Sequence, residues 1–264
     1  MRIAILAMDD PLYMNNFIKK IIDGRSNDKL LFVYVSKGNR LTIGKNKSKI
    51  IYIISLLLIM GLKEFIRNSI ITVIHNFKKK FSSNFNFIKS PLVVNHAHSR
   101  NIPTLEITNP NTKKFLEKLT EFNPDIIINQ SQCIIKQELL KIPKIGVLNR
   151  HNALLSKNRG RLTPFWVLYK GETETGVSIH FVTEDLDAGD IIVQKKFSIE
   201  KNDNFNTIVK KNYELAPVAM LKALKKLEHE NYKTIPNEDS SATYNTIPTF
   251  KEALKFRLRR IFTL

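Results

Sequence analysis

The sequence predicts an α/β fold: a Rossmann-like, mostly parallel sheet flanked by helices, with an inserted helical segment and a short C-terminal helical extension. Two observations predict the sheet and one predicts the insert. Short runs rich in Ile, Val and Leu recur along the chain, and segments with apolar residues at helical spacing separate them. A long apolar run with basic flanks then interrupts this alternation. With 264 residues, the chain can form one large domain and a small appendix.

The first 35 residues predict a strand, a helix and a second strand. Residues 2–8 form a compact apolar run that ends at Asp9, and residues 30–35 form a second β-rich run. Between them, residues 11–23 carry apolar side chains three or four positions apart, which is typical of a helix with one buried face. Strand, helix and strand at this length indicate a parallel sheet.

Residues 45–85 are predicted to form one or two helices inserted into the sheet domain. Residues 50–62 are an apolar run of 13, which is short of the roughly 20 residues that span a bilayer. Residues 37–80 also hold ten Lys and Arg against one acid, Glu64. Two interpretations stay open. The helices pack on their own sheet or at a homodimer interface, or they form a basic amphipathic surface for anionic lipid.

The alternation resumes after the insert. Three strands are predicted at residues 103–107, 124–129 and 145–149, with helices at 111–122 and 137–140. Two late strands at 176–182 and 191–197 and an amphipathic helix at 205–228 follow. After residue 231 the chain becomes polar and ends in a basic tail. We therefore predict a main domain over residues 1–200 and a C-terminal helix with a basic tail over residues 201–264.

Charge and cysteine content restrict the classes of partner. The net charge is +18, which favours anionic partners such as nucleic acid, acidic lipid or a phosphorylated small molecule. The single cysteine, Cys133, excludes an internal disulfide framework, and residues 1–8 are too short for a secretory signal. We predict a cytoplasmic protein, with a peripheral place at the inner membrane face as the alternative. No Gly-rich phosphate loop and no cysteine–histidine metal pattern is present, so no metal is expected.

The strongest candidate for chemistry is Asn149-x-His151, which ends an apolar strand. Side chains two positions apart on a strand share a face, so both groups are expected to point the same way at the carboxyl edge of the sheet. An amide and an imidazole can together polarise a carbonyl and transfer protons. The acidic loop around Asp187 could orient the histidine. Taken singly, each motif also fits a simpler interpretation, a satisfied polar pair at a strand end or a solvated turn.

Together these motifs resemble the formyltetrahydrofolate-dependent formyltransferases, most closely the sugar N-formyltransferases. Methionyl-tRNA formyltransferase and glycinamide ribonucleotide formyltransferase belong to the same family. The residues that carry the resemblance are Asn149-x-His151, Leu154-Leu155, Arg159-Gly160, the run from Gly171 to His180, and Leu186-Asp187-Ala188-Gly189-Asp190. After the histidine the family usually has Pro-Ser, whereas this sequence has Asn152-Ala153. A proline commonly follows the two leucines in the family, whereas this sequence has Ser156. The shape of that loop is therefore expected to differ.

The resemblance implies roles for individual residues. Asn149 and His151 would stabilise the oxyanion that forms when an amine attacks the formyl carbon of N10-formyltetrahydrofolate, and Asp187 would hold His151. Residues 1–200 would then be the catalytic domain. The folate co-substrate is expected at Gln132, Cys133, Ile134, Ile135, Asp185 and Leu186. Arg159 and Trp166 are expected to contact the substrate, although Trp166 is equally compatible with a place in the core.

The amine is the open question. Resemblance to the sugar enzymes at residues 163–168 and 242–244 favours a nucleotide-linked amino sugar of surface-polysaccharide (lipopolysaccharide) biosynthesis as the partner. Methionyl-tRNA is the runner-up because of the high charge, but the last 64 residues are too few for the β-barrel that helps such enzymes bind tRNA. Hydrolysis of formyltetrahydrofolate and a folate-binding protein without activity are further alternatives.

Overall fold

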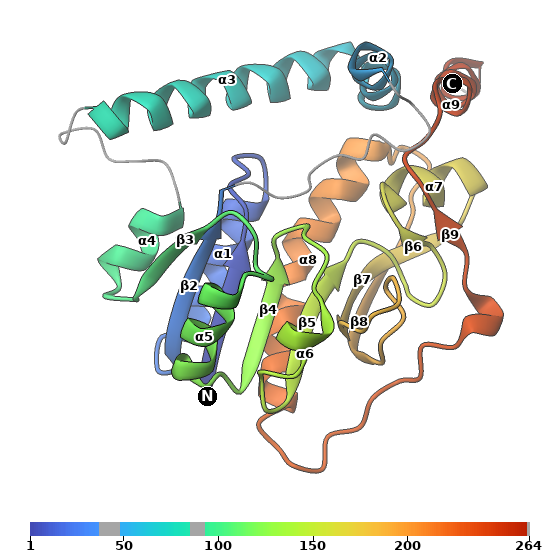
Figure 1. Cartoon of the computed structure of the whole chain (residues 1–264). Helices are drawn as coiled ribbons and strands as arrows, with labels where there is room; N and C mark the ends of the chain where they lie inside the picture. Colours follow the sequence, from blue (N-terminus) through green and yellow to red (C-terminus); the bar gives the residue numbers. More distant parts are fainter. Residues whose placement is uncertain (37–47, 85–92, 263–264) are drawn as a thin grey trace.

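A computed structural model describes residues 1–36, 48–84 and 93–262 of the chain. Its centre is a seven-stranded sheet in the order β3-β2-β1-β4-β5-β7-β8 (Figure 1). The five strands from β3 to β5 run parallel, while β7 is antiparallel to both β5 and β8. The strands are β1 (Arg2–Ala7), β2 (Lys29–Val35), β3 (Thr104–Ile107), β4 (Ile126–Gln130), β5 (Gly146–His151), β7 (Glu174–Phe181) and β8 (Ile191–Ser198). The predicted Rossmann-like, mostly parallel sheet is confirmed.

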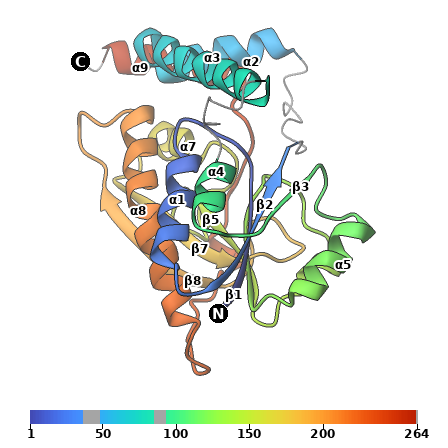
Figure 2. The ribbon, with the colours of Figure 1, turned by 90° about the vertical axis from the view of Figure 1, so that its left-hand side faces the viewer.

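Helices cover both faces of this sheet, which makes three layers (Figures 1 and 2). On one face, α1 (Met14–Gly24), α4 (Val93–Ser99) and α8 (Phe205–Lys226) bury a large apolar cluster against the strands. On the other face, α5 (Lys113–Phe122) and α6 (Gln137–Leu140) bury a second cluster. Because both faces are covered, the apolar residues of β1 and of the first part of β4 are consecutive rather than alternating.

The insert forms two helices, as predicted: α2 (Lys49–Met60) and α3 (Leu62–Asn84). Residues 45–47 and 85 of the predicted insert lie outside the described residues. In α2, Ile59 joins a third apolar cluster with Phe165 of α7 (Thr163–Lys170) and Phe256 of α9 (Phe250–Phe262). The helices α2, α3 and α9 lie on the same side of the molecule, above the sheet domain (Figures 1 and 2).

The segment after residue 231 differs from the predicted polar tail. It includes the short 3-10 helix η1 (Asp239–Ser241), the strand β9 (Tyr244–Asn245) and α9. β9 pairs in parallel with β6 (Arg159–Gly160), so this segment packs beside the residues that follow β5. Its apolar side chains at Phe250, Ala253 and Phe256 are spaced for a helix, but the intervening Lys and Arg hide that spacing in the sequence. The division of the chain at residue 200 stays a prediction.

Candidate active site

The carboxyl edge of the parallel strands collects the polar groups of the sheet. The sheet grows outward from β1 in one direction to β2 and β3, and in the other to β4 and β5. Parallel α/β sheets bind ligands at such a switch point, beyond the carboxyl ends of the strands. Gln130 ends β4, while Asn149 and His151 end β5. Across β5, the antiparallel register sets His180 of β7 opposite Asn149.

The Asn149 carboxamide is held from both sides. Its Oδ1 accepts a hydrogen bond of 2.8 Å from Gln130 Nε2, and its Nδ2 lies 3.5 Å from Nε2 of His180. Gln130 is itself oriented, because its Oε1 accepts a 3.1 Å hydrogen bond from Arg150 Nε. Arg150 can only donate, so the whole chain of hydrogen bonds has one direction. The amide of Asn149 is therefore fixed before any ligand arrives.

His151 and Asp187 form the second half of the site. His151 Nδ1 lies 3.5 Å from Asp187 Oδ2, and His151 Nε2 lies 2.8 Å from the carbonyl oxygen of Asn158. Both ring nitrogens thus face oxygen atoms, so the orientation of the His151 ring is set from both sides. His151 is buried and the Asp187 side chain is 10% exposed, so this interaction is little screened by water.

A second histidine, His180, lies on the other side of Asp187. Its Nε2 is 3.7 Å from Asp187 Oδ1, and its ring meets that of His151 edge-on. Burial lowers the pKa of His180 to about 4, although the Asp187 carboxylate acts in the opposite direction. His180 is therefore neutral at pH 7. Its Nδ1 is 2.8 Å from the Phe181 carbonyl oxygen and must carry the proton, so Nε2 can accept from Asn149.

The loop that carries Asp187 is tied down at several points. Asp187 has a positive φ of 51°, and its Oδ2 accepts a 2.9 Å hydrogen bond from the backbone amide of Gly160. Asn237 Nδ2 donates to the backbone carbonyl groups of Asp187 and Gly189. A Cβ on Gly189 would lie 2.2 Å from the Phe181 carbonyl oxygen, so only glycine fits there. The carboxylate is thereby fixed between the two histidines.

The structure thus brings Asn149, His151 and Asp187 together around His180, and their catalytic roles stay a prediction. The comparisons with known proteins bear on the family of the chain. A protein family described as formyl transferase matches residues 1–224. The chain belongs to the formyl transferase family.

Relatives of this chain include methionyl-tRNA formyltransferases. That of Kosmotoga olearia is 35% identical over 149 residues, which cover 56% of this chain and 48% of that protein. That of Ehrlichia ruminantium is 30% identical over 224 residues, which cover 79% of this chain and 73% of that protein. The chain spans about half the length of several of the relatives that it matches.

Solved structures of similar fold include two kinds of formyl transferase. A glycinamide ribonucleotide transformylase from Symbiobacterium toebii has a TM-score of 0.59 at 14% identity and covers 90% of this chain and 94% of its own. An N-formyltransferase from Helicobacter canadensis, in complex with folinic acid and dTDP-3-aminofucose, has a TM-score of 0.55 at 15% identity, covering 92% of this chain and 70% of its own. At these identities the likeness establishes the shared fold.

The residues predicted at the folate side lie on two loops, one that follows Gln130 and one that leads to Asp187. The first loop follows Gln130: Gln132 has a positive φ of 56°, Ile134 is 76% exposed and Cys133 is half-buried. Ile135 instead buries its side chain in the second core cluster. The second loop carries Asp185 and Leu186 directly before Asp187, and Leu186 is 58% exposed.

Arg159 and Trp166, predicted at the substrate, both bind the chain's own C-terminal segment. The Arg159 guanidinium is fully buried, and it donates to Asn237, to Asp239 and to the Tyr244 hydroxyl. Trp166 Nε1 donates to the carbonyl oxygen of Thr246 at 2.7 Å. These contacts hold the C-terminal segment beside Gly160, which in turn binds Asp187. A direct contact with substrate stays a prediction for both residues.

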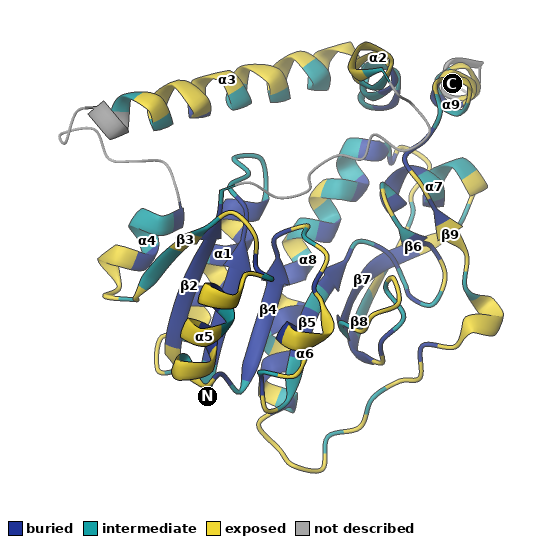
Figure 3. Ribbon diagram, in the orientation of Figure 1, coloured by how far each residue is buried: buried dark blue, intermediate teal, exposed yellow. Residues whose placement is uncertain are grey.

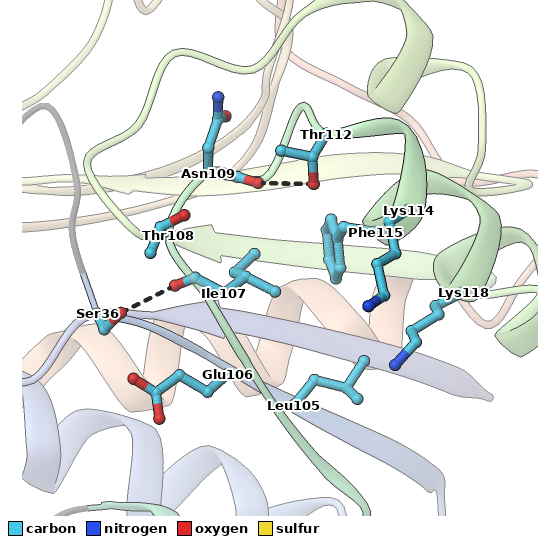
Figure 4. A pocket seen from close by; sticks show the side chains of 10 residues that line it. All are labelled: Ser36, Leu105, Glu106, Ile107, Thr108, Asn109, Thr112, Lys114, Phe115 and Lys118. Carbon is cyan, nitrogen blue, oxygen red and sulfur yellow. Dashed lines mark hydrogen bonds between the residues drawn. The ribbon is translucent and has the colours of Figure 1, made fainter.

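The sequence did not identify Gln130, His180 or the carbonyl of Asn158 as parts of the site. A signal for His180 was present, because Ser178 and His180 interrupt an apolar strand at a spacing of two. A cavity of about 340 Å³ lies elsewhere, beside β3 and α5 near the opposite edge of the sheet (Figure 4). Lys114 and Lys118 line it, together with Glu106, and none of the trio does.

Proposed function

We propose that the chain transfers a formyl group from N10-formyltetrahydrofolate to an amine. The observation that carries the proposal is the fixed group of Asn149, His151 and Asp187 at the carboxyl edge of the sheet. Formyl transfer passes through a tetrahedral species with a negatively charged oxygen, and catalysis requires donors that are oriented before the reaction. The site offers such donors and one carboxylate, and membership of the formyl transferase family supports the same chemistry.

The residues divide the work between charge stabilisation and proton transfer. The amine nitrogen forms the new bond to the formyl carbon, the bond from that carbon to N10 of the folate breaks, and the amine proton is finally carried by N10. Asn149 offers a fixed N–H for the oxyanion because Gln130 sets the direction of its amide. His151 offers an imidazole N–H for the oxyanion and for proton transfer, and Asp187 orients its ring. His180 stays neutral and adds no competing charge.

The formyl-folate supplies the electrophilic formyl carbon, and two loops of the chain fit such a donor. Ile134 on the first loop and Leu186 on the second present exposed apolar side chains, which a flat ring system can contact. The first loop is also held in place, because Asn111 Nδ2 donates to the carbonyl oxygen of Ile134 at 2.8 Å. Backbone groups would provide the contacts of the other predicted residues, Gln132, Cys133, Ile135 and Asp185. For Ile135 this follows from its side chain, which is buried in the core.

We propose a nucleotide-linked amino sugar as the acceptor, in the biosynthesis of a surface polysaccharide such as lipopolysaccharide. A similar fold in an N-formyltransferase bound to dTDP-3-aminofucose supports this class, as does the strongly basic chain, which suits a diphosphate. The single cysteine and a charged small-molecule substrate support a cytoplasmic reaction. Methionyl-tRNA is the second candidate, because the relatives of known sequence are methionyl-tRNA formyltransferases.

One experiment separates these functions. Purified protein is incubated with N10-formyltetrahydrofolate and dTDP- or GDP-linked amino-dideoxy sugars, charged initiator tRNA, or no acceptor, and mass spectrometry follows the formylated product. We expect a formylated sugar nucleotide and no formyl-methionyl-tRNA. Formylation of the tRNA alone would contradict the sugar proposal, and equal folate loss without any acceptor would indicate a hydrolase. No folate loss under any condition would contradict formyl transfer itself.

A further inference from the structure

The helix α3 turns polar side chains toward the protein and apolar side chains toward solvent, which is the reverse of an ordinary surface helix. Among the described side chains of α3, His75 is the only buried one, and its Nε2 lies 2.7 Å from Asp9 Oδ2 at the end of β1. Lys79 Nζ donates to the Tyr34 hydroxyl at 2.7 Å. Polar groups thus attach α3 to the protein, whereas a surface helix normally turns its apolar stripe inward.

The outward face of α3 is apolar along its length. Its exposed residues are spaced three or four apart, which places them on one side of the helix. Figure 3 shows this face of α3 as largely exposed. The exposed apolar residues of α3 are Leu62 (63% exposed), Ile66 (48%), Ile70 (53%), Val73 (66%), Ile74 (49%) and Phe77 (60%).

The neighbouring helices extend this surface. In α2, Ile50, Ile53 and Ile54 are 69%, 50% and 41% exposed. In α9, Leu254 and Leu258 are 37% and 44% exposed and lie four residues apart. Because α2, α3 and α9 lie on one side of the molecule (Figures 1 and 2), that side carries most of the large apolar side chains that are exposed among the described residues, and these side chains make up the apolar patch. A typical soluble surface carries such residues singly.

The charge of these helices indicates what covers the patch. The sequences of α2, α3 and α9 contain eleven Lys and Arg against two Glu, which is half of the chain's net charge. A twofold dimer would set this basic surface against an identical one, so its charges would repel. An anionic bilayer offers both complements, because its headgroups pair with Lys and Arg while its acyl region receives Ile, Val and Phe.

We propose that α2, α3 and α9 dock this formyl transferase onto the surface of an anionic phospholipid bilayer, with the helices lying in the interface. Within the described ranges, no helix combines the length and apolar content that crossing a membrane requires. Docking leaves the carboxyl edge of the sheet next to the membrane surface, because His75 ties α3 to Asp9, two residues after β1 ends. An acceptor sugar made or used at that surface would then meet the enzyme there.

The test compares two valines that are similarly exposed on helix surfaces, one inside the proposed docking surface and one outside it. Val73 on α3 is 66% exposed and Val218 on α8 is 53% exposed, so glutamate at either position leaves the core intact. The full chain and both variants are floated with vesicles of phosphatidylcholine alone, or of phosphatidylcholine mixed with phosphatidylglycerol, at low and high salt. Circular dichroism and thermal melting check the fold of each variant.

We expect binding to the vesicles that contain phosphatidylglycerol, weakening with salt. Val73→Glu should lower the partition coefficient by about tenfold, since it removes one inserted side chain and adds a repelled charge, while Val218→Glu should not. No binding, or equal loss in both variants, would overturn the proposal. It would also be overturned if Val73→Glu converted a dimer to a monomer in sedimentation, or if it weakened tRNA binding but not vesicle binding.

Discussion

The burial of His180 should make the stability of this protein depend on pH in a predictable way. The neutral ring is enclosed by β5, β7 and the Asp187 loop, and its pKa falls from the ordinary 6.5 to about 4. Between these two values the unfolded chain binds a proton at this position and the folded chain does not. The contribution of His180 to the free energy of unfolding should therefore be complete above about pH 6.5 and should decrease as the pH falls toward 4.

The size of the effect follows from the shift. Two and a half pKa units correspond to roughly 3 kcal/mol in total, at about 1.4 kcal/mol per unit. Lowering the pH from 7.5 to 5 should remove roughly 2 kcal/mol of this contribution, since the unfolded histidine is then almost fully protonated and the folded one mostly neutral. For a marginally stable domain this loss is large.

Urea unfolding at the two pH values measures the prediction. His180→Asn removes the titrating ring, so this variant should lose roughly 2 kcal/mol less than the wild-type chain when the pH is lowered. His229→Asn is the matched control, because His229 is exposed near the end of α8, and it should keep the wild-type pH dependence. If His180→Asn and the wild-type chain lost the same free energy, the proposed burial of a neutral histidine would be refuted.

Three further predictions concern the site. His151→Ala and Asp187→Asn should each lower turnover by about a hundredfold or more with the fold retained by circular dichroism, and near-normal turnover in either would contradict the assigned roles. Gln130→Met should release the Asn149 amide and lower kcat about tenfold while KM changes little, so an unchanged kcat would show that this contact does not matter. Arg159→Met should reduce stability by roughly 2–3 kcal/mol in urea unfolding, whereas Lys157→Met, at an exposed position, should not; equal effects would refute the structural role of Arg159.

Much of the fold could be predicted because strands and helices bury their apolar faces at different periods. The sheet strands carry short apolar runs, and α1 and α5 carry apolar residues at helical spacing, so both kinds of element are visible in the sequence. The missed elements lack this signal. The strands β6 and β9 have two residues each, and α9 intersperses its buried residues with Lys and Arg.

The sequence predicts which site residues share one strand, but it does not predict which residues of neighbouring strands approach them. Asn149 and His151 share a strand face, so their proximity follows from local geometry. Gln130 and His180 approach Asn149 from neighbouring strands on either side, and that requires the strand order and the antiparallel register of β5 and β7. Arg159 shows the opposite limit. Its place in a motif suggested a ligand, but its guanidinium binds Asn237 and Asp239, about eighty positions later in the sequence.

The candidate site requires a fixed geometry, whereas an insertion requires a place where added residues disturb little. In this chain the two lie in different parts of the sheet. The groups assigned to formyl transfer lie on β4, β5 and β7 or in the loop between β7 and β8, and each of these three strands has a partner on both sides. The insert lies in the connection from β2 toward β3, near the outer edge of the sheet, where added residues disturb no strand pairing. Yet one contact joins the two regions, since His75 of α3 pairs with Asp9, which follows the central strand β1. A surface that docks through α3 is therefore mechanically attached to the edge of the sheet at which the proposed reaction takes place.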